Sequence, residues 1–92
     1  SYYGAKFHGR RTSSGEAYNK DGYTAAHKTL PFGTIVRVTA VWNQKSVDVK
    51  INDRGPFSHG RVIDISTAAA REIGMISKGI GHVQLQVVFY PK

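Results

Sequence analysis

The stretch SVDVKINDRGPF, residues 46–57, decides the fold, because it joins the clearest strand pattern in the chain to an abrupt stop. Its apolar residues Val47, Val49 and Ile51 occur at every second position, as expected for a strand with one buried face. The polar residues on the opposite, exposed face are Ser46, Asp48, Lys50 and Asn52. Continued alternation predicts that Asp53 shares the buried face, before a glycine and a proline end the strand.

Other segments predict a mainly β fold around this strand, with one or two short helices. Residues 34–41, TIVRVTAV, and residues 82–90, HVQLQVVFY, show the same alternation, and residues 60–66, GRVIDIS, form another short candidate strand. Residues 66–74, STAAAREIG, are typical of a short helix. Because a single short open sheet would leave exposed edges, these elements favour closure into a small barrel.

Length and composition limit the number of domains and the kinds of site that the chain can form. At 92 residues it is predicted to be one domain, residues 1–92, with a small core. It has no cysteine, and its four histidines lack the spacing of metal ligands, so we expect neither a metal site nor a cofactor. No apolar run approaches the roughly 20 residues of a membrane span, and no signal peptide is recognisable. The start at Ser1 rather than Met indicates a trimmed piece of a longer protein.

The net charge of +7 favours an anionic partner, such as nucleic acid, anionic lipid or an acidic cell-wall polymer. The basic residues are scattered, however, and only Arg10 and Arg11 are adjacent. Nothing in the sequence resembles a recognition helix or a base-stacking motif. We therefore expect no nucleic acid partner, and a solvated basic surface is the simpler interpretation.

Three titratable residues are candidates for catalysis. On the buried face Asp53 would be partly desolvated, which raises a carboxyl pKa, while the neighbouring Arg54 would oppose that shift. From the pattern alone Asp53 is equally well a turn brace that accepts hydrogen bonds from the residues after it. Glu16 follows a Ser-Gly turn signal, and His27 is able to orient a carboxylate, although loop and structural roles are the simpler interpretation for both.

Aromatic residues cluster around these polar groups in the sequence, and aromatic faces with converging polar groups suit a sugar ring. They are Tyr2, Tyr3, Phe7, Tyr18, Tyr23 and Phe57. A small barrel also uses such residues in its core, so both interpretations stay open.

Four segments together resemble a known family. They are YYGAKFHGRRTSSGEAY (2–18), TAAHKTLPFGTIVRV (24–38), VKINDRGPFSHGRVIDIS (49–66) and STAAAREIGM (66–75). In this order and spacing they resemble the double-psi β-barrel domain of the rare lipoprotein A family, the septal lytic transglycosylases of bacterial cell walls. The resemblance implies a six-stranded barrel of two interlocked psi-shaped halves, with a groove for a glycan strand.

By that resemblance the acid of the NDRGPF motif, Asp53, is the catalytic residue, with Glu16 and His27 as its partners in the groove. For substrate binding we expect Tyr3, Asn19, Asn52, Arg54 and Phe57. The family often has an acid three positions after the glutamate, where this chain has Asn19. Its amide is still able to hydrogen-bond a sugar hydroxyl.

The implied reaction cleaves the bond between N-acetylmuramic acid and N-acetylglucosamine, preferably in glycan stripped of stem peptides. The 6-hydroxyl of muramic acid attacks in place of water and leaves a 1,6-anhydro end, and one carboxyl acts first as acid and then as base. Two alternatives stay open. One is a muramidase-type hydrolase in which Glu16 activates water. The other is a non-catalytic wall-binding module, since expansins use this type of barrel on polysaccharide.

The resemblance also implies a location and a partner. The location is the bacterial cell envelope, in the periplasm, with outer-membrane anchoring or secretion left open. The partner is the peptidoglycan glycan strand, and we expect a monomer. The lipid-bearing cysteine and the C-terminal glycan-binding repeat domain of the family fall outside residues 1–92, so these residues give no basis for septal targeting.

Overall fold

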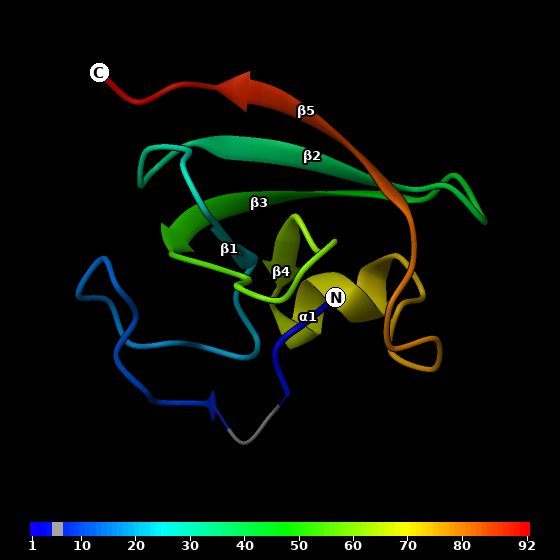
Figure 1. Cartoon of the computed structure of the whole chain (residues 1–92), viewed down its shortest axis with the longest axis horizontal. Helices are drawn as coiled ribbons and strands as arrows, with labels where there is room; N and C mark the ends of the chain where they lie inside the picture. The colour runs from blue at the N-terminus through cyan, green and yellow to red at the C-terminus, as the bar shows by residue number, and fades with distance from the viewer. Residues whose placement is uncertain (5–6) are drawn as a thin grey trace.

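The computed structural model describes residues 1–4 and 7–92, so Ala5 and Lys6, inside the first quoted motif, lie outside the described residues. Five strands form one sheet in the order β4-β1-β3-β2-β5. The strands are β1 (Thr24–His27), β2 (Ile35–Ala40), β3 (Ser46–Asp53), β4 (Ile63–Ile65) and β5 (Val83–Phe89), and the helix is α1 (Thr67–Glu72). The sheet curls so that β1, β4 and α1 lie below β3, β2 and β5 in the view of Figure 1.

This architecture confirms the predicted mainly β fold with a short helix. β1 and β3 run parallel, and the other neighbouring strands are antiparallel. In the part of the chain that the structure describes, the sheet has five strands where the resemblance implied six. Within the described residues, the first part of the chain pairs through single bridges, Tyr2 with Ile65 and Arg11 with Ala17. The curled sheet therefore has the form of a half-barrel to which the N-terminal loops are added.

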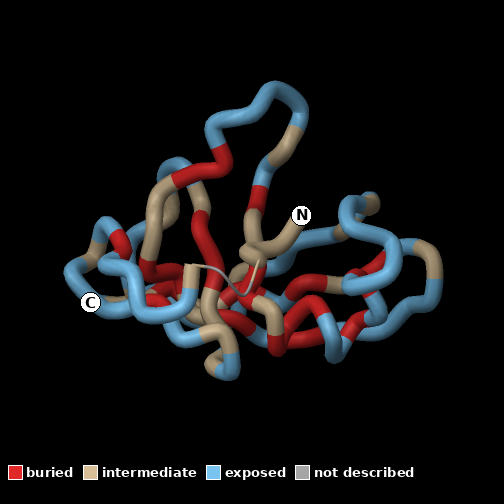
Figure 2. Tube along the Cα trace, turned by 90° about the horizontal axis from the view of Figure 1, so that it is seen from below, coloured by how far each residue is buried: buried red, intermediate tan, exposed pale blue. Residues whose placement is uncertain are grey.

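The core forms where the alternating strands meet the helix. Val36 and Val38 of β2 and Val49 and Ile51 of β3 are buried, as the alternation predicts. The rest of the core comprises Ala25, Ala40, Val47, Ile63, Ile65, Ala69, Ala70, Ile73 and Met75. Figure 2 shows the buried stretches gathered in the middle of the molecule, with the exposed stretches in the surrounding loops. Removal of these apolar side chains from water is the main force that holds the sheet in its curled form.

β5 departs in part from its predicted pattern. Val83 and Val87 pack against the core. Leu85 and Phe89, which share their alternation, are 36% and 55% exposed. β5 is the last strand of the described sheet and pairs with β2 on one side. Because β5 lies at this edge, the core covers only part of its apolar side.

The end of β3 is irregular, and this irregularity corrects the predicted side-chain pattern. Ala25 pairs with Ile51 but Ala26 pairs with Asp53, so Asn52 is an extra residue in the strand, a β-bulge. Asn52 is 4% exposed, whereas Asp53 is only partly buried. The alternation that placed Asn52 on the exposed face was therefore wrong, whereas Asp53 is partly desolvated, as predicted.

The turn after β3 explains why the strand ends at Asp53. Gly55 has a φ of 126°, a backbone conformation that residues with side chains rarely adopt, and the Gly55–Pro56 peptide bond is cis. Proline also lacks the N–H that would continue the hydrogen-bond ladder. The predicted stop at Arg54-Gly55-Pro56 is confirmed.

Ser66 ties the start of α1 to a neighbouring loop. Its hydroxyl accepts a hydrogen bond from Ala69 N at 3.3 Å and donates one to the Gly22 carbonyl oxygen at 2.6 Å. Because the N-cap is lost, we expect Ser66→Ala to lower the free energy of unfolding by about 1–2 kcal/mol. Urea denaturation measures this effect. The control is Ser77→Ala at an exposed serine, for which a change below about 0.5 kcal/mol is expected; equal effects of the two variants would contradict the capping role.

Candidate active site

Asp53 lies at the end of β3 with both carboxylate oxygens held. Oδ1 accepts hydrogen bonds from the backbone N–H groups of Ser13 and Arg54, each at 2.8 Å. Oδ2 accepts one from the hydroxyl of Tyr3 at 2.6 Å. Since Tyr3 and Ser13 are far from Asp53 in the sequence, folding assembles the environment of this carboxyl.

These hydrogen bonds decide the ionisation of Asp53. Burial by itself raises the carboxyl pKa, but the hydrogen bonds from Tyr3, Ser13 and Arg54 together outweigh burial and hold the pKa of Asp53 below its usual range. The sequence alone did not show whether burial or neighbouring groups dominate the pKa of Asp53. In the structure the charged form of Asp53 is favoured. In the free protein Asp53 is therefore a carboxylate at neutral pH.

The lowered pKa of Asp53 predicts an acid-sensitive contribution to stability. Because folding favours the charged form, the contribution is complete above the pKa of an unfolded aspartate, about 3.9, and is lost as the pH falls through the lower folded pKa. The free energy of unfolding of Asp53→Asn should therefore fall less steeply than that of the wild type between about pH 4 and pH 2. Chemical denaturation across this range measures the difference, and identical slopes would count against it.

A short loop brings Glu16 to the same end of β3. The loop spans residues 11–17 and is closed by a backbone bridge between its ends. Ser14 N donates a hydrogen bond to the carbonyl oxygen of Asn52 at 3.2 Å. Glu16 Oε2 accepts one from Lys50 Nζ at 3.0 Å. The same loop also supplies a backbone donor to Asp53, so it fixes both carboxylates to one strand end.

Glu16 is also ionised in the free protein. The hydrogen bond from Lys50 is the main cause of the lowered pKa of Glu16, and hydrogen bonding to Asn52 and Ser14 lowers it further, against an opposing effect of burial. Asn52 Oδ1 is buried and, in the part of the chain that the structure describes, has no hydrogen-bond partner. Glu16 is therefore equipped to accept protons or hydrogen bonds rather than to donate them.

His27 ends β1, the strand that runs parallel to β3. Because neighbouring parallel strands end at the same edge of a sheet, His27 reaches the edge where Asp53 lies. Its Nδ1 accepts hydrogen bonds from the backbone N–H groups of Thr29 at 3.2 Å and Leu30 at 3.1 Å. Burial, and then the nearby Arg54 and a neighbouring lysine, lower the pKa of His27. The imidazole is therefore neutral with its proton on Nε2, which is free of these bonds and able to donate.

Arg54 holds the turn that follows His27. Its Nη1 donates hydrogen bonds to the carbonyl oxygens of His27 at 3.0 Å and Leu30 at 2.8 Å. The guanidinium also lies over the ring of Phe32, 4.1 Å from the ring centroid. The structure thus gives Arg54 a bracing role that the sequence did not predict, while its binding to substrate stays a prediction.

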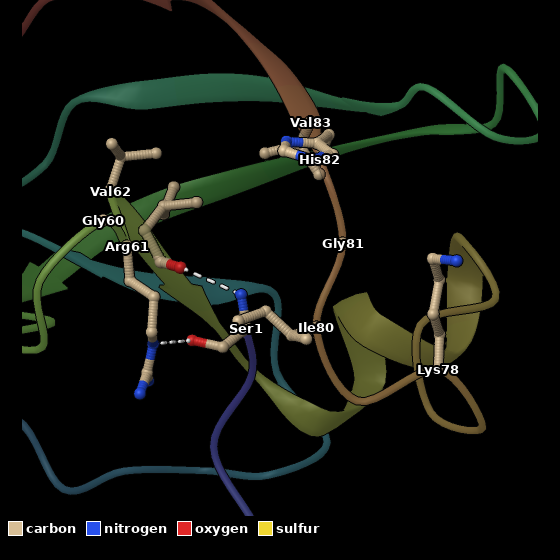
Figure 3. A pocket seen from close by; sticks show the side chains of 10 residues that line it. Ser1, Gly60, Arg61, Val62, Lys78, Ile80, Gly81, His82 and Val83 are labelled. Atoms are coloured by element: carbon tan, nitrogen blue, oxygen red, sulfur yellow. Dashed lines mark hydrogen bonds between the residues drawn. The ribbon is translucent and has the colours of Figure 1, made fainter.

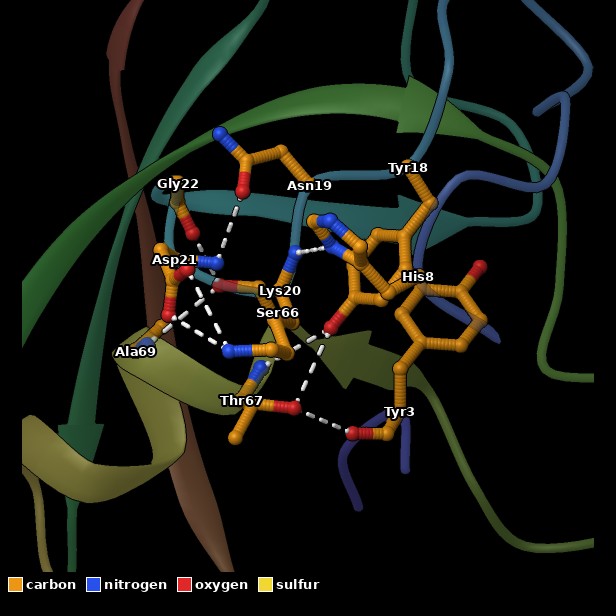
Figure 4. Close-up of polar contacts among 10 residues, drawn as sticks. All are labelled: Tyr3, His8, Tyr18, Asn19, Lys20, Asp21, Gly22, Ser66, Thr67 and Ala69. Atoms are coloured by element: carbon orange, nitrogen blue, oxygen red, sulfur yellow. Dashed lines mark hydrogen bonds and ion pairs between the residues drawn. The ribbon is translucent and has the colours of Figure 1, made fainter. Parts of the chain in front are cut away.

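Asn19 and Phe57 are the two other predicted substrate-binding residues. Asn19 Oδ1 accepts a hydrogen bond from Asp21 N at 3.0 Å, which braces the turn drawn in Figure 4. Among the described residues, no hydrogen bond is found between Asn19 and either Asp53 or Glu16. Phe57 follows the turn after β3 and is 81% exposed. A ring this exposed contributes little to the core and is free to contact a ligand.

A cavity of about 520 Å³ lies elsewhere in the molecule (Figure 3). It is lined by Ser1, Gly60, Arg61, Val62, Ile63, Lys78, Ile80, Gly81, His82 and Val83. The residues predicted for catalysis or substrate binding are not part of this lining. The candidate site is instead the partly exposed surface at the end of β3. Such a surface suits a long polymer better than a small molecule, which binds in a concave pocket.

Residues 1–4 and 7–92 contain neither a metal-binding cluster nor a membrane-spanning helix. No three histidine, aspartate or glutamate side chains of these residues are grouped closely enough to hold a metal ion. In the same residues no helix has the length and apolar character needed to cross a bilayer.

Sequence reasoning missed two members of the site, Lys50 and the backbone N–H of Ser13. The available signal for Lys50 was its place on the polar face of β3, close to Asp53 in the sequence. Its partner Glu16 is 34 positions away; the family resemblance implied that Glu16 lies near Asp53, but it did not indicate the ion pair with Lys50.

Three curated proteins with similar sequences are named as endolytic or probable endolytic peptidoglycan transglycosylases. The chain is 58% identical over 88 residues to "Endolytic peptidoglycan transglycosylase RlpA" of Pasteurella multocida, which covers 96% of this chain and 30% of that protein. It is 60% identical over 88 residues to the "Probable endolytic peptidoglycan transglycosylase RlpA" of Synechocystis, covering 96% of this chain and 27% of that protein. It is 54% identical over 92 residues to the "Endolytic peptidoglycan transglycosylase RlpA" of Haemophilus influenzae. This match covers 100% of this chain and 32% of that protein.

The chain thus spans between 27% and 32% of the length of these three relatives. The family described as "Lytic transglycolase" matches residues 1–85, which include every residue of the candidate site. The curled, mainly β sheet and the quoted motifs agree with this match. The chain therefore belongs to the lytic transglycolase family, as an RlpA-like double-psi β-barrel domain.

Proposed function

We propose that this domain is a peptidoglycan lytic transglycosylase, which cleaves the bond between N-acetylmuramic acid and N-acetylglucosamine in glycan strands. The observation that carries the proposal is Asp53, a partly exposed carboxylate in the NDRGPF motif whose two oxygens are fixed by Tyr3, Ser13 and Arg54. The printed names of relatives that are 54% to 60% identical support the same reaction.

Asp53 exchanges one proton twice in this reaction. Its acid form gives the proton to the glycosidic oxygen, so that the bond to C1 of muramic acid breaks and N-acetylglucosamine leaves. The carboxylate then takes the proton of the 6-hydroxyl of muramic acid, whose oxygen bonds to C1 and closes the 1,6-anhydro ring. No water is consumed and Asp53 returns to its acid form. Each of the two roles contributes roughly 10²- to 10⁴-fold to the rate.

The lowered pKa of Asp53 bears on the first step, because the free protein holds this carboxyl charged. A glycan strand that covers the site removes water, and desolvation favours the neutral acid. Substrate binding therefore raises the pKa of Asp53 and loads the proton that the leaving group needs.

Glu16 and His27 act on the glycan beside Asp53. The Glu16 carboxylate, held by Lys50, accepts hydrogen bonds from sugar hydroxyls and favours the positive charge that develops on the ring at C1. The neutral His27 donates its Nε2–H to a sugar oxygen. The exposed ring of Phe57 offers a face for a sugar to lie on.

A hydrolase is the second candidate, because Glu16 is an ionised carboxylate at the same strand end as Asp53. An inverting hydrolase needs its second carboxylate about 6.5–9.5 Å from the acid, where it activates water. In that scheme Glu16 is the base and the product has a reducing end.

Digestion of denuded glycan strands, followed by mass spectrometry of the fragments, separates the candidates. The proposal expects fragments whose muramic acid ends are one water lighter than hydrolysis products. Reducing ends would favour the hydrolase. Binding to purified sacculi with no released fragment from any substrate would favour a non-catalytic wall-binding module and overturn the proposal.

The same reaction defines where the protein acts. Peptidoglycan lies in the bacterial cell envelope, so we place the domain in the periplasm, acting as a monomer on glycan strands. The names of the relatives support peptidoglycan as the substrate and therefore the cell envelope as the location. The net charge of +7 assists binding to denuded strands, because loss of the stem peptide leaves a free lactyl carboxylate on each muramic acid.

A further inference from the structure

Tyr3 connects the carboxyl of Asp53 to the start of α1. Its hydroxyl donates to Asp53 Oδ2 at 2.6 Å. At the other end of the residue, its carbonyl oxygen accepts a hydrogen bond from Thr67 Oγ1 at 2.8 Å, and its N–H donates to Ile65 O at 2.8 Å. The backbone of Tyr3 is therefore fixed to β4 and α1, and its side chain extends from there to Asp53.

The ring of Tyr3 is held as well. It lies against the ring of Tyr18, with centroids 4.9 Å apart, and meets the edge of Phe7 at 5.9 Å. Tyr18 is itself buried, and its hydroxyl accepts a hydrogen bond from Thr67 N at 3.0 Å (Figure 4). Figure 4 shows the Tyr18 hydroxyl and the backbone carbonyl of Tyr3 meeting at Thr67. Because the ring and both ends of Tyr3 are fixed, its hydroxyl has little freedom to leave Oδ2.

The two oxygens of Asp53 are consequently unequal. Oδ1 accepts hydrogen bonds from two backbone N–H groups. Because a backbone N–H can only donate, these two bonds disfavour a proton on Oδ1. Oδ2 accepts a hydrogen bond from the hydroxyl of Tyr3, and a hydroxyl that donates is also able to rotate and accept. Oδ2 is therefore the oxygen that can gain and lose a proton without leaving a fixed donor unpaired.

We propose that Tyr3 is a positioning residue for the reaction, which holds Oδ2 of Asp53 as the oxygen that exchanges the proton with the glycan. This inference rests on the proposed function and assigns Tyr3 a role other than the substrate contact predicted from the sequence. Tyr3 donates to the carboxylate form of Asp53 and accepts from its acid form until the glycosidic oxygen takes the proton. Tyr3 keeps its own proton and acts through Asp53 rather than by contact with the glycan.

Burial first, and then the hydrogen bond to Asp53, raise the pKa of Tyr3, so the phenol stays protonated throughout the working pH range. The bond in turn favours the charged form of Asp53. Asp64 on β4 and Tyr18 also raise the pKa of Tyr3, and Arg54 binds Asp53 through its backbone N–H. The other charged or titratable groups at this end of the sheet are Glu16 on the 11–17 loop, Lys50 on β3 and His27 at the end of β1.

The test compares Tyr3→Phe with Tyr18→Phe. The first variant keeps the ring and removes the donor to Asp53, and the second removes a buried hydroxyl that binds Thr67 and not Asp53. For Tyr3→Phe we expect a higher pKa of the Asp53 carboxyl. NMR titration of the free protein measures this pKa. We also expect a shift of the pH profile in the same direction and a kcat roughly 10- to 100-fold lower, with KM nearly unchanged. Tyr18→Phe should unfold at a lower temperature but keep the wild-type Asp53 pKa and pH profile.

A second variant tests the pair from the other side. In Asp53→Asn the pKa of the Tyr3 phenol should fall, because the carboxylate that opposes its ionisation is gone. This readout needs no substrate and holds if Tyr3→Phe fails to fold. The inference is overturned if the Tyr3 pKa does not change in Asp53→Asn. It is also overturned if folded Tyr3→Phe keeps the wild-type kcat and pH profile. If the wild type releases no fragments from glycan, the proposed function falls and the positioning role with it, even where the two pKa values prove coupled.

Discussion

Asp53→Asn is expected to lower the rate of glycan cleavage by at least about 100-fold, because the amide can neither give a proton to the glycosidic oxygen nor take one from the 6-hydroxyl. The substitution keeps the size of the side chain and an oxygen that accepts from Ser13 and Arg54. The domain should therefore stay folded, which circular dichroism checks. Release of fragments from denuded strands measures the rate.

Asp48→Asn is the matched control for this substitution. Asp48 lies in the same strand, on its exposed face, and pairs with Arg37 at 2.9 Å. Exposed ion pairs contribute at most about 1 kcal/mol to stability, so this variant should keep both fold and activity. Equal losses in Asp48→Asn and Asp53→Asn would show a general charge effect. Full activity in folded Asp53→Asn would mean that the catalytic acid has been assigned wrongly.

Glu16→Gln separates the lytic and hydrolytic schemes further. With Asp53 as sole acid and base, this variant should keep the anhydro product and lose only part of the rate. If Glu16 activates water, the variant should instead lose its hydrolytic product almost completely.

Ile51→Ala is expected to lower the free energy of unfolding by about 2–5 kcal/mol. The Ile51 side chain of β3 is fully buried. Its N–H donates to Thr34 O and its carbonyl oxygen accepts from Gly33 N, each at 2.8 Å, and on the other side of the strand it pairs with Ala25 of β1. The strand β3 and the neighbouring segment at residues 33–34 therefore cannot move easily into the cavity that the substitution leaves. A domain of this size has only about 5–15 kcal/mol of stability, so the loss is a large share of the total.

Urea denaturation measures this effect, with two controls. Ile51→Val removes one methyl group and should cost about 0.5–1.5 kcal/mol. Val62→Ala changes an exposed side chain and should cost less than about 0.5 kcal/mol. If Ile51→Ala were no worse than Val62→Ala, the core described around β3 would be wrong.

The main strands were predictable because apolar residues occur at every second position in the sequence, and every second side chain of a strand faces the core. Val36, Val38, Val49 and Ile51 are buried where the alternation places them. The short helix after β4 was also readable from residue type, since short polar side chains cap helices; Ser66 and Thr67 were both candidates, and the cap is Ser66. Each of these inferences depends on neighbours close in the sequence, which is why they succeeded.

The end of β3 was not predictable by the same means. A bulge at Asn52 moves Asn52 into the interior and leaves Asp53 partly exposed, and single-residue insertions of this kind leave no mark in an alternating pattern. Long-range contacts decided the rest: the partners of Asp53 lie 40 and 50 positions away in Ser13 and Tyr3. The resemblance to a family named Asp53, but only the fold shows what holds its two oxygens.

Cleavage of denuded glycan strands in water enriched in the heavy oxygen isotope tests most directly whether Asp53 catalyses transglycosylation. The 6-hydroxyl of muramic acid supplies the attacking oxygen in the proposed reaction, so the new ends should carry no heavy oxygen and weigh one water less than reducing ends. The signal should disappear in Asp53→Asn and persist in Asp48→Asn. Reducing ends that carry the heavy isotope, formed by the wild type, would contradict the proposed reaction.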